Sequence, residues 1–210
     1  MRRFGAVLGV LLIGLATIDL PAQNPPPAGG SAPAAPGGQR GGGRGRGAVQ
    51  VMTLTTPAWK DGGLIPLRHT QAGDEVSPAL EWTNVPETAV SFVLVMHDID
   101  AATGDGTSDL LHWLVWNIPG TVRQLPEGVP SGAQLADGTR QISGTGPYFR
   151  GPGAPANGPP HHYVFELFAL DGTIDVAPIG ASPAETRAAV LAALAGKVRG
   201  KATMVGLHKR

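Results

Sequence analysis

The most informative stretch of the chain runs from residue 91 to residue 119 and reads SFVLVMHDIDAATGDGTSDLLHWLVWNIP. It contains two largely apolar runs, at residues 92–96 and 111–118, with a polar, glycine-containing segment between them. Apolar runs of this length that are bounded by turn formers are typical of strands buried on both faces. The stretch therefore predicts two central strands of a sheet.

Three further strands are expected on either side of this stretch, at residues 49–55, 161–170 and 202–207. The chain contains 31 glycines and 20 prolines, and this number of turn formers argues against an all-helical bundle. Many strands and one late helix favour a mainly β fold. We expect a β-sandwich of antiparallel sheets with a C-terminal helix.

The helix is expected directly after Ser182, because residues 182–185 have the sequence of a capping box with proline at the first helical position. Its apolar face would contain Val190, Leu191, Leu194 and Val198. Such a helix would cover an edge or an end of the sheets.

The first 47 residues differ in composition from the rest of the chain. Arg2 and Arg3 precede an uncharged apolar run at residues 4–16, which is the pattern of a secretory signal peptide and is short for a membrane span. We predict a signal peptide at residues 1–22, a disordered Pro/Gly/Arg-rich linker at 23–47 and a folded domain at 48–210. The mature protein would be periplasmic or secreted, without a stable membrane span. A retained anchor is the alternative.

Charge and cysteine content exclude several classes of protein. Five of the sixteen basic residues and one of the sixteen acidic residues precede residue 48, so residues 48–210 carry a formal net charge of −4. A mildly acidic domain is a poor ligand for a phosphate backbone, and we expect no nucleic-acid partner. The chain has no cysteine, which excludes disulfides and thiol chemistry.

Polar residues adjoin both apolar runs of the central stretch. Asp98 and Asp100 follow the first run, where the chain ends a buried strand and a carboxylate would lie in a cleft or in solvent. His112 opens the second run, and strand alternation places it on one face with Leu114 and Trp116. Each position also fits an ordinary role, the aspartates as a strand-to-loop exit and the histidine as a core residue.

A third polar cluster opens the strand expected at residues 161–170. Alternation places His161 and Tyr163 on one face and His162 on the other. A histidine and a tyrosine on one face can offer hydrogen bonds to a ligand, or they can form an edge pair that water solvates.

Together these segments resemble the phosphatidylethanolamine-binding protein family. Residues 91–119 are similar to its first motif, a buried strand with an acidic turn followed by a His-Trp pair. Residues 148–171 are similar to its second motif, a Gly/Pro-rich loop that leads to a histidine and a tyrosine. Residues 77–82 resemble the bacterial Raf kinase inhibitor-like branch, and the resemblance covers about residues 50–208.

The resemblance implies a ligand pocket. Its residues in this sequence would be Asp98, Asp100, His112, Tyr148, Gly151, Gly153, His161 and Tyr163. The glycine loop would supply backbone N–H groups to an oxyanion, and an aspartate would fix a histidine tautomer. Ile99 and Ala102 replace two prolines of the family's motif. Either Tyr148 or Phe149 would occupy the aromatic position before the loop.

The expected function is that of a binding protein for a small anionic or phosphorylated ligand, such as a phospholipid head group. An inhibitor or partner-binding protein that acts through residues 103–109 is an alternative, because these residues form a loop in the central stretch. A metal-dependent hydrolase is a third hypothesis, although the chain has neither His-Glu-x-x-His nor Gly-x-Ser-x-Gly. We expect no cofactor, no bound metal and no catalytic activity.

Overall fold

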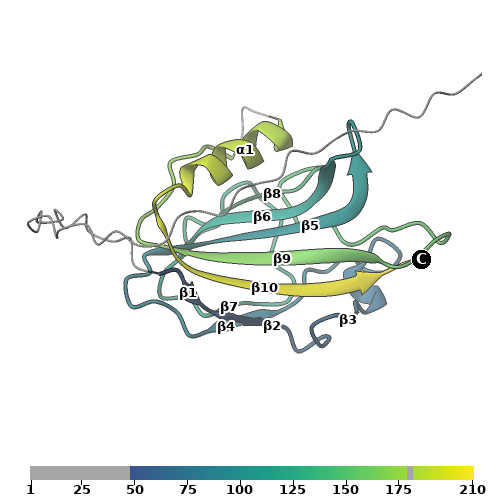
Figure 1. Ribbon diagram of the computed structural model, residues 1–210, viewed down its shortest axis with the longest axis horizontal. Helices are drawn as coiled ribbons and strands as arrows, with labels where there is room; N and C mark the ends of the chain where they lie inside the picture. Colours follow the sequence, from purple (N-terminus) through teal and green to yellow (C-terminus); the bar gives the residue numbers. More distant parts are fainter. Residues whose placement is uncertain (1–47, 179–181) are drawn as a thin grey trace, which may run out of the picture. The chain divides into compact units, whose positions relative to one another are not determined.

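Two β-sheets and one α-helix form the part of the chain that the computed structural model describes, residues 48–178 and 182–210 (Figure 1). The signal peptide expected at residues 1–22 and the linker expected at 23–47 lie outside the described residues. In chain order the elements are β1 Gln50–Val51, β2 Thr53–Thr55, β3 Gly63–Leu64, a 3₁₀ turn Leu67–His69, β4 Leu80–Thr83, β5 Ser91–Thr103, β6 Ser108–Pro119, β7 Gln124–Leu125, β8 Arg140–Ile142, β9 His161–Leu170, α1 Pro183–Ala193 and β10 Val198–His208.

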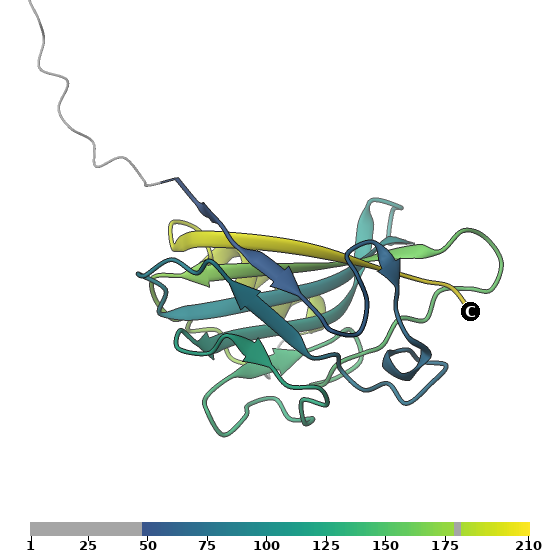
Figure 2. The same cartoon turned by 90° about the horizontal axis from the view of Figure 1, so that it is seen from below.

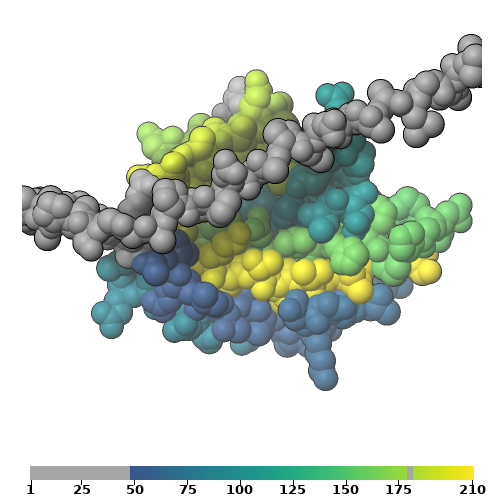
Figure 3. Space-filling view, viewed as in Figure 1, coloured from purple at the N-terminus to yellow at the C-terminus, as the bar shows by residue number. Residues whose placement is uncertain are grey.

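The larger sheet has seven strands in the order β1-β10-β9-β5-β6-β8, and β3 also pairs with β10. Strands β10, β9, β5, β6 and β8 are antiparallel to their neighbours, whereas β1 and β3 run parallel to β10. The larger sheet is therefore mixed, and the expectation of antiparallel sheets holds from β10 to β8 but not for β1 and β3. In Figure 3, β10 appears as a yellow band on the surface, bordered by the blue residues of the N-terminal strands.

The smaller sheet has three antiparallel strands in the order β2-β4-β7, and it packs across one face of the larger sheet (Figure 2). The core between the sheets contains large side chains from both layers, among them Trp82, Phe92, Trp113, Phe165 and Leu167. The single strand expected at residues 49–55 is interrupted at Met52. Its first part, β1, pairs in the larger sheet, and its second part, β2, pairs in the smaller sheet.

The central apolar runs behave as predicted. Every side chain from Phe92 to Met96 in β5 is at most 1% exposed. Phe92, Leu94 and Met96 face the smaller sheet, while Val93 and Val95 belong to a second cluster on the other face. A strand that is covered on both faces needs this continuous apolar sequence.

Helix α1 covers the second face of the larger sheet, not an edge or an end as the sequence suggested (Figure 1). Its capping box is present, since the Ser182 hydroxyl accepts the Glu185 N–H and the Glu185 carboxylate accepts the Ser182 N–H. Val190 and Leu194 are buried in the second cluster, whereas Leu191 is 38% exposed. Val198 was expected on the helix, but it begins β10. No helix among the described residues is long and apolar enough to cross a membrane.

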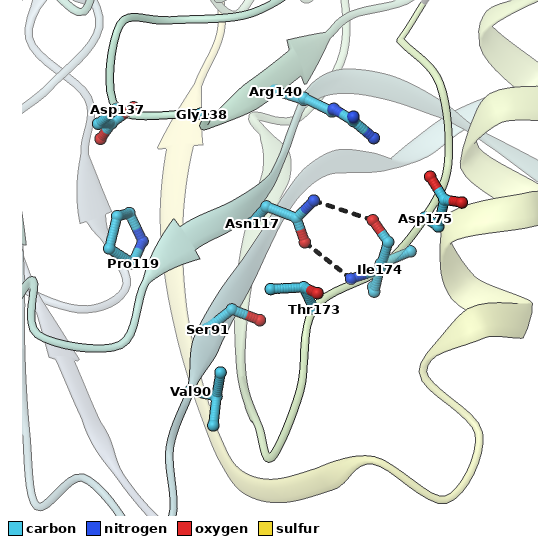
Figure 4. Close-up of a pocket in the computed structure, with 10 residues that line it drawn as sticks. All are labelled: Val90, Ser91, Asn117, Pro119, Asp137, Gly138, Arg140, Thr173, Ile174 and Asp175. Carbon is cyan, nitrogen blue, oxygen red and sulfur yellow. Dashed lines mark hydrogen bonds between the residues drawn. The ribbon is translucent and has the colours of Figure 1, made fainter.

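Two of the register shifts between β5 and β6 are β-bulges that leave an extra residue in β6. Phe92 lies opposite Ile118 and Val93 opposite Trp116, so Asn117 is an extra residue, with a positive φ of 58°. Its side-chain amide donates to the carbonyl of Ile174 and accepts from the N–H of the same residue (Figure 4). The first bulge thereby fastens the segment that follows β9 to the sheet.

A cluster of charged side chains connects α1 to the sheet. Arg187 of α1 pairs with Asp109 in β6, and the Nδ1 atom of His97 in β5 contacts the same carboxylate. The Nε2 atom of His97 lies 3.5 Å from Oε2 of Glu166, and Lys201 pairs with the other oxygen of Glu166 at 2.6 Å. The imidazole thus lies between two carboxylates that are contributed by neighbouring strands.

Candidate functional site

A cavity of about 280 Å³ lies at the end of the larger sheet where β9 begins. Its lining comes from β5, β6, β9, the loop before β9 and one residue near the 3₁₀ turn: Gln71, Asp98, Ala101, Leu110, His112, Arg150, Gly153, Ala154, Pro155, His161 and Tyr163. Five of the eight residues named from the sequence are among them: Asp98, His112, Gly153, His161 and Tyr163. The fold therefore brings together positions that are up to 65 residues apart in the chain, from Asp98 to Tyr163.

Asp98 is the buried acid of this cavity and is only 2% exposed. Its Oδ1 atom accepts the backbone N–H groups of Asp100 and Ala101, both at 3.0 Å. Its Oδ2 atom lies 2.9 Å from Nδ1 of His161 and accepts a hydrogen bond from it. Asp98 therefore fixes the orientation of the His161 ring, and Nε2 is the nitrogen of that ring that remains for a ligand.

His112 reaches the cavity because of the second β-bulge. His97 lies opposite Leu111 and Met96 opposite Trp113, which leaves His112 as the extra residue of β6. Strict alternation had placed His112 on one face with Leu114 and Trp116, and that expectation is wrong. The bulge turns His112 toward Tyr163, whose ring it meets edge-on with the centroids 5.0 Å apart.

The hydrogen bonds of His112 determine which tautomer its neutral ring adopts. The Nδ1–H group donates to the carbonyl of Arg150 at 2.9 Å, and the backbone N–H of Arg150 donates to the carbonyl of His112 at 3.1 Å. The Nε2 atom is buried and has no hydrogen-bond partner among the described residues. Burial lowers the pKa of His112, although the Arg150 carbonyl and the charge of Asp98 oppose this effect.

Tyr163 supplies a phenol to the cavity, and its ring is fully buried. The backbone N–H of Gly153 donates to the phenol oxygen at 3.3 Å. Burial, together with the nearby charge of Asp98, raises the pKa of Tyr163 well above its usual value. The phenol is therefore neutral at physiological pH and keeps its own O–H as a donor.

The glycine loop shapes the cavity, but its N–H groups already have partners. The Gly151 N–H donates to the Glu75 carboxylate, and the Gly153 N–H is used by Tyr163. A Cβ atom at Gly151 would lie 2.7 Å from the carbonyl oxygen of His69, and one at Gly153 would lie 2.5 Å from the side chain of Gln71. The glycines thus permit close packing, and Gly151 itself does not line the cavity.

Besides Gly151, two of the residues named from the sequence lie outside the cavity. Asp100 is at an exposed position, where its carboxylate accepts from the backbone N–H of His162 at 2.6 Å and from the His162 ring at 2.8 Å. Tyr148 is partly exposed, and its hydroxyl donates to the carbonyl of Thr145. Phe149 is buried against Trp113, so neither aromatic residue reaches the cavity.

Sequence reasoning missed Gln71 and Arg150. Gln71 is bonded to the loop through its Nε2 atom, which donates to the carbonyl of Gly151 at 2.8 Å. Arg150 is the only basic residue in the Gly/Pro-rich stretch at 144–160, and this position was a usable signal. The arginines that form ion pairs in the described part of the chain are Arg68, Arg187 and Arg199, so no carboxylate neutralises Arg150.

Other hollows differ in chemistry from this cavity. The one in Figure 4, of about 490 Å³, surrounds Asn117, whose amide is already satisfied by Ile174. A groove of about 720 Å³ separates the β5–β6 hairpin from α1. The loop at 103–109, named as a candidate partner-binding segment, contributes residues 103, 104 and 107–109 to this groove and none to the cavity. Within residues 48–178 and 182–210, no three acidic or histidine side chains are grouped as metal ligands would be.

Comparisons with known proteins agree on one family. The family model described as phosphatidylethanolamine-binding protein matches residues 55–209. A UPF0098 protein of Methanothermobacter thermautotrophicus is 41% identical over 162 residues, which are 76% of this chain and 99% of that protein.

Solved structures give the same result. Escherichia coli YbcL, described as a member of the mammalian PEBP family, superposes with a TM-score of 0.62 at 30% identity, over 76% of this chain and 98% of that one. The homologue CT736 of Chlamydia trachomatis superposes with a TM-score of 0.63 at 28% identity, over 77% of this chain and 99% of that one. The matched family model, the identity to relatives and the shared fold lead to one conclusion: the chain belongs to the phosphatidylethanolamine-binding protein family.

Proposed function

We propose that this chain is an exported binding protein that holds a small phosphorylated or otherwise anionic ligand, such as a phospholipid head group, in the cavity beside Asp98. Membership of the family supports a ligand-binding fold. Export rests on the sequence of residues 1–22, and fractionation of cells that express the full chain tests it. We further propose that the protein binds without catalysis and needs no cofactor.

The observation that carries this proposal is the set of polar groups that converge on the cavity. The Nε2 atom of His161 and the guanidinium of Arg150 have hydrogen-bonding capacity that the described residues leave unused, and the phenol of Tyr163 lines the same cavity. A phosphate group presents several acceptor oxygens, and a guanidinium binds such oxygens well. A volume of about 280 Å³ suits a head group better than a whole lipid.

Calorimetric titration of the full chain with phosphoethanolamine tests the proposal. His161→Ala removes one ligand-facing imidazole and should weaken binding by about tenfold or more. The matched control is His162→Ala, which removes the next imidazole along the strand, on the opposite face and outside the cavity. Absence of binding by the wild-type chain, or equal loss in both variants, contradicts the proposed site.

The groove between the β5–β6 hairpin and α1 supports a second candidate function, in which the protein binds a protein partner there. Leu110, Leu111, Ala188 and Leu191 contribute an apolar lining, and Leu191 is 38% exposed. Replacement of residues 104–107 by a shorter turn should then abolish partner binding and leave the affinity for phosphoethanolamine unchanged. A parallel loss of phosphoethanolamine binding would contradict the separation of the two sites.

A further inference from the structure

The state of His112 restricts which anions the cavity can accept. A carbonyl oxygen only accepts hydrogen bonds, so the bond to the Arg150 carbonyl requires a proton on Nδ1 of His112. In the neutral ring, Nε2 then carries a lone pair and no proton. This atom has no partner among the described residues, and the His112 side chain is 1% exposed. Such a buried acceptor without a partner is a site where a ligand can donate a hydrogen bond.

Several titratable or charged groups face this ring, and they have opposing effects. The Asp98 carboxylate favours the imidazolium, while the Arg150 guanidinium disfavours it. Tyr163 meets the ring edge-on and is neutral, and His161 is held by Asp98. Burial outweighs these influences and lowers the pKa of His112 below its ordinary value of 6.5. At neutral pH, therefore, the ring is an acceptor.

Oxyanions differ in their ability to donate to such an acceptor. Inorganic phosphate keeps an O–H group throughout the neutral range, whereas sulfate has only lone pairs. A phosphate monoester has an O–H group only below its second pKa of about 6. An anion without a donor would place an oxygen lone pair against that of Nε2, and both groups would remain unsatisfied in a buried place.

We propose that His112 accepts a hydrogen bond from the ligand through Nε2, and that this makes the cavity selective for phosphates that carry an O–H group over tetrahedral oxyanions that carry none. This inference rests on the proposed function, since it assumes that the cavity beside Asp98 binds phosphorylated groups. It adds the protonation state of the ligand as the property that is recognised. Among phosphorylated ligands, it favours a phosphate or a protonated monoester over the phosphodiester of an intact phospholipid, which has no O–H group to donate.

Calorimetry on the full chain with inorganic phosphate, methyl phosphate and sulfate tests the inference. Inorganic phosphate should bind at least about tenfold more tightly than sulfate near pH 8, where the His112 ring is neutral. Methyl phosphate should lose about tenfold in affinity for each pH unit above its second pKa. Its titration near pH 8, repeated in two buffers with different ionisation enthalpies, should show uptake of about one proton.

A His112→Gln variant provides the matched test, because its amide can turn an N–H group toward the ligand. The preference for phosphate over sulfate should then largely disappear. His162→Gln makes the same change outside the cavity and should keep the preference. Circular dichroism establishes whether His112→Gln folds. If this variant does not fold, the affinities of the wild-type chain for the three anions still test the selectivity.

The possible results separate the two proposals. If the wild-type chain binds phosphate and sulfate equally well and without proton uptake, the role of His112 is refuted while the anion site stands. If it binds none of the three anions, the proposed function fails, and this inference fails with it.

Discussion

Two histidines line the cavity, and their partners give them different properties. His161 donates to the carboxylate of Asp98, whereas His112 donates to a backbone carbonyl inside a buried environment. Arg150 lies on the same lining and has no carboxylate partner among the described residues. The cavity therefore combines a fixed positive charge with a neutral acceptor, a combination that suits a singly protonated phosphate.

Removal of the Arg150 charge should weaken anion binding. We expect Arg150→Gln to lower the affinity for phosphoethanolamine by about tenfold, since hydrogen bonds to charged groups contribute about 1.5–3 kcal/mol. The affinity should also become less sensitive to salt. Calorimetry at two salt concentrations measures both effects. Arg140→Gln is the control, because Arg140 donates to the carbonyl of Val176 beside the hollow of Figure 4. Equal effects of the two variants would argue against a role for Arg150 in binding.

The absence of a side chain at Gly153 leaves room for Gln71. In Gly153→Ala, the new Cβ would displace the Gln71 side chain and strain its hydrogen bond to the Gly151 carbonyl. Because the obstructing atoms belong to a flexible side chain, we expect a loss of only about 1 kcal/mol in unfolding free energy. Urea denaturation measures this loss of unfolding free energy. The variant should also bind phosphoethanolamine more weakly, and unchanged binding would mean that Gln71 does not help to shape the site.

The face on which a site residue lies was predictable only where strand alternation is regular. His161 and Tyr163 lie on one face and His162 on the other, as the sequence indicated, because β9 pairs without a bulge at this end. The face of His112 was not predictable, since a bulge depends on the pairing of two strands. Asp100 was named from the family resemblance, but its carboxylate is hydrogen-bonded to His162 and lies outside the cavity.

At the scale of elements, the charged cluster between α1 and the sheet should make stability depend on pH. Burial is the largest single influence on His97 and lowers its pKa, but Glu166 and Asp109 together raise that pKa above 6.5. A raised pKa means that the charged ring stabilises the folded state. This stabilisation is fully present below pH 6.5 and is lost as the pH rises through the pKa of the folded state.

A His97→Gln variant tests this pH dependence. Near pH 6 it should be less stable than the wild-type chain by about 1 kcal/mol, and near pH 9 the difference should shrink. Urea denaturation at the two pH values gives both numbers. A difference of the same size at both values would mean that His97 acts through packing and not through its charge.

The elements with strong local sequence patterns were predicted correctly, whereas those fixed by pairing were not. The capping box located the start of α1, and the apolar runs located β5, β6 and β9. The short strands β3, β7 and β8 have two or three residues each and carry no periodicity of their own. The face on which α1 packs depends on which side of the sheet lacks the smaller sheet, and this is a tertiary property.

At the scale of the whole molecule, residues 48–210 should fold without the preceding segment. The two sheets and α1 lie within residues 50–208, and both hydrophobic clusters are formed by residues of this part. A chain that begins at Ala48 should therefore unfold cooperatively, at the same temperature as the full chain within about 2 °C. Differential scanning calorimetry measures this. A much lower unfolding temperature would show that residues 1–47 stabilise the fold.

The position of β10 has a consequence for how the protein is made. This last strand in the sequence pairs with β9 on one side and with β1 and β3 on the other. On the ribosome, β1 and β3 emerge long before the strand that completes their pairing, so the larger sheet cannot close until residues 198–208 have been synthesised. Up to that point the nascent chain stays open, which is the state that the proposed export would require.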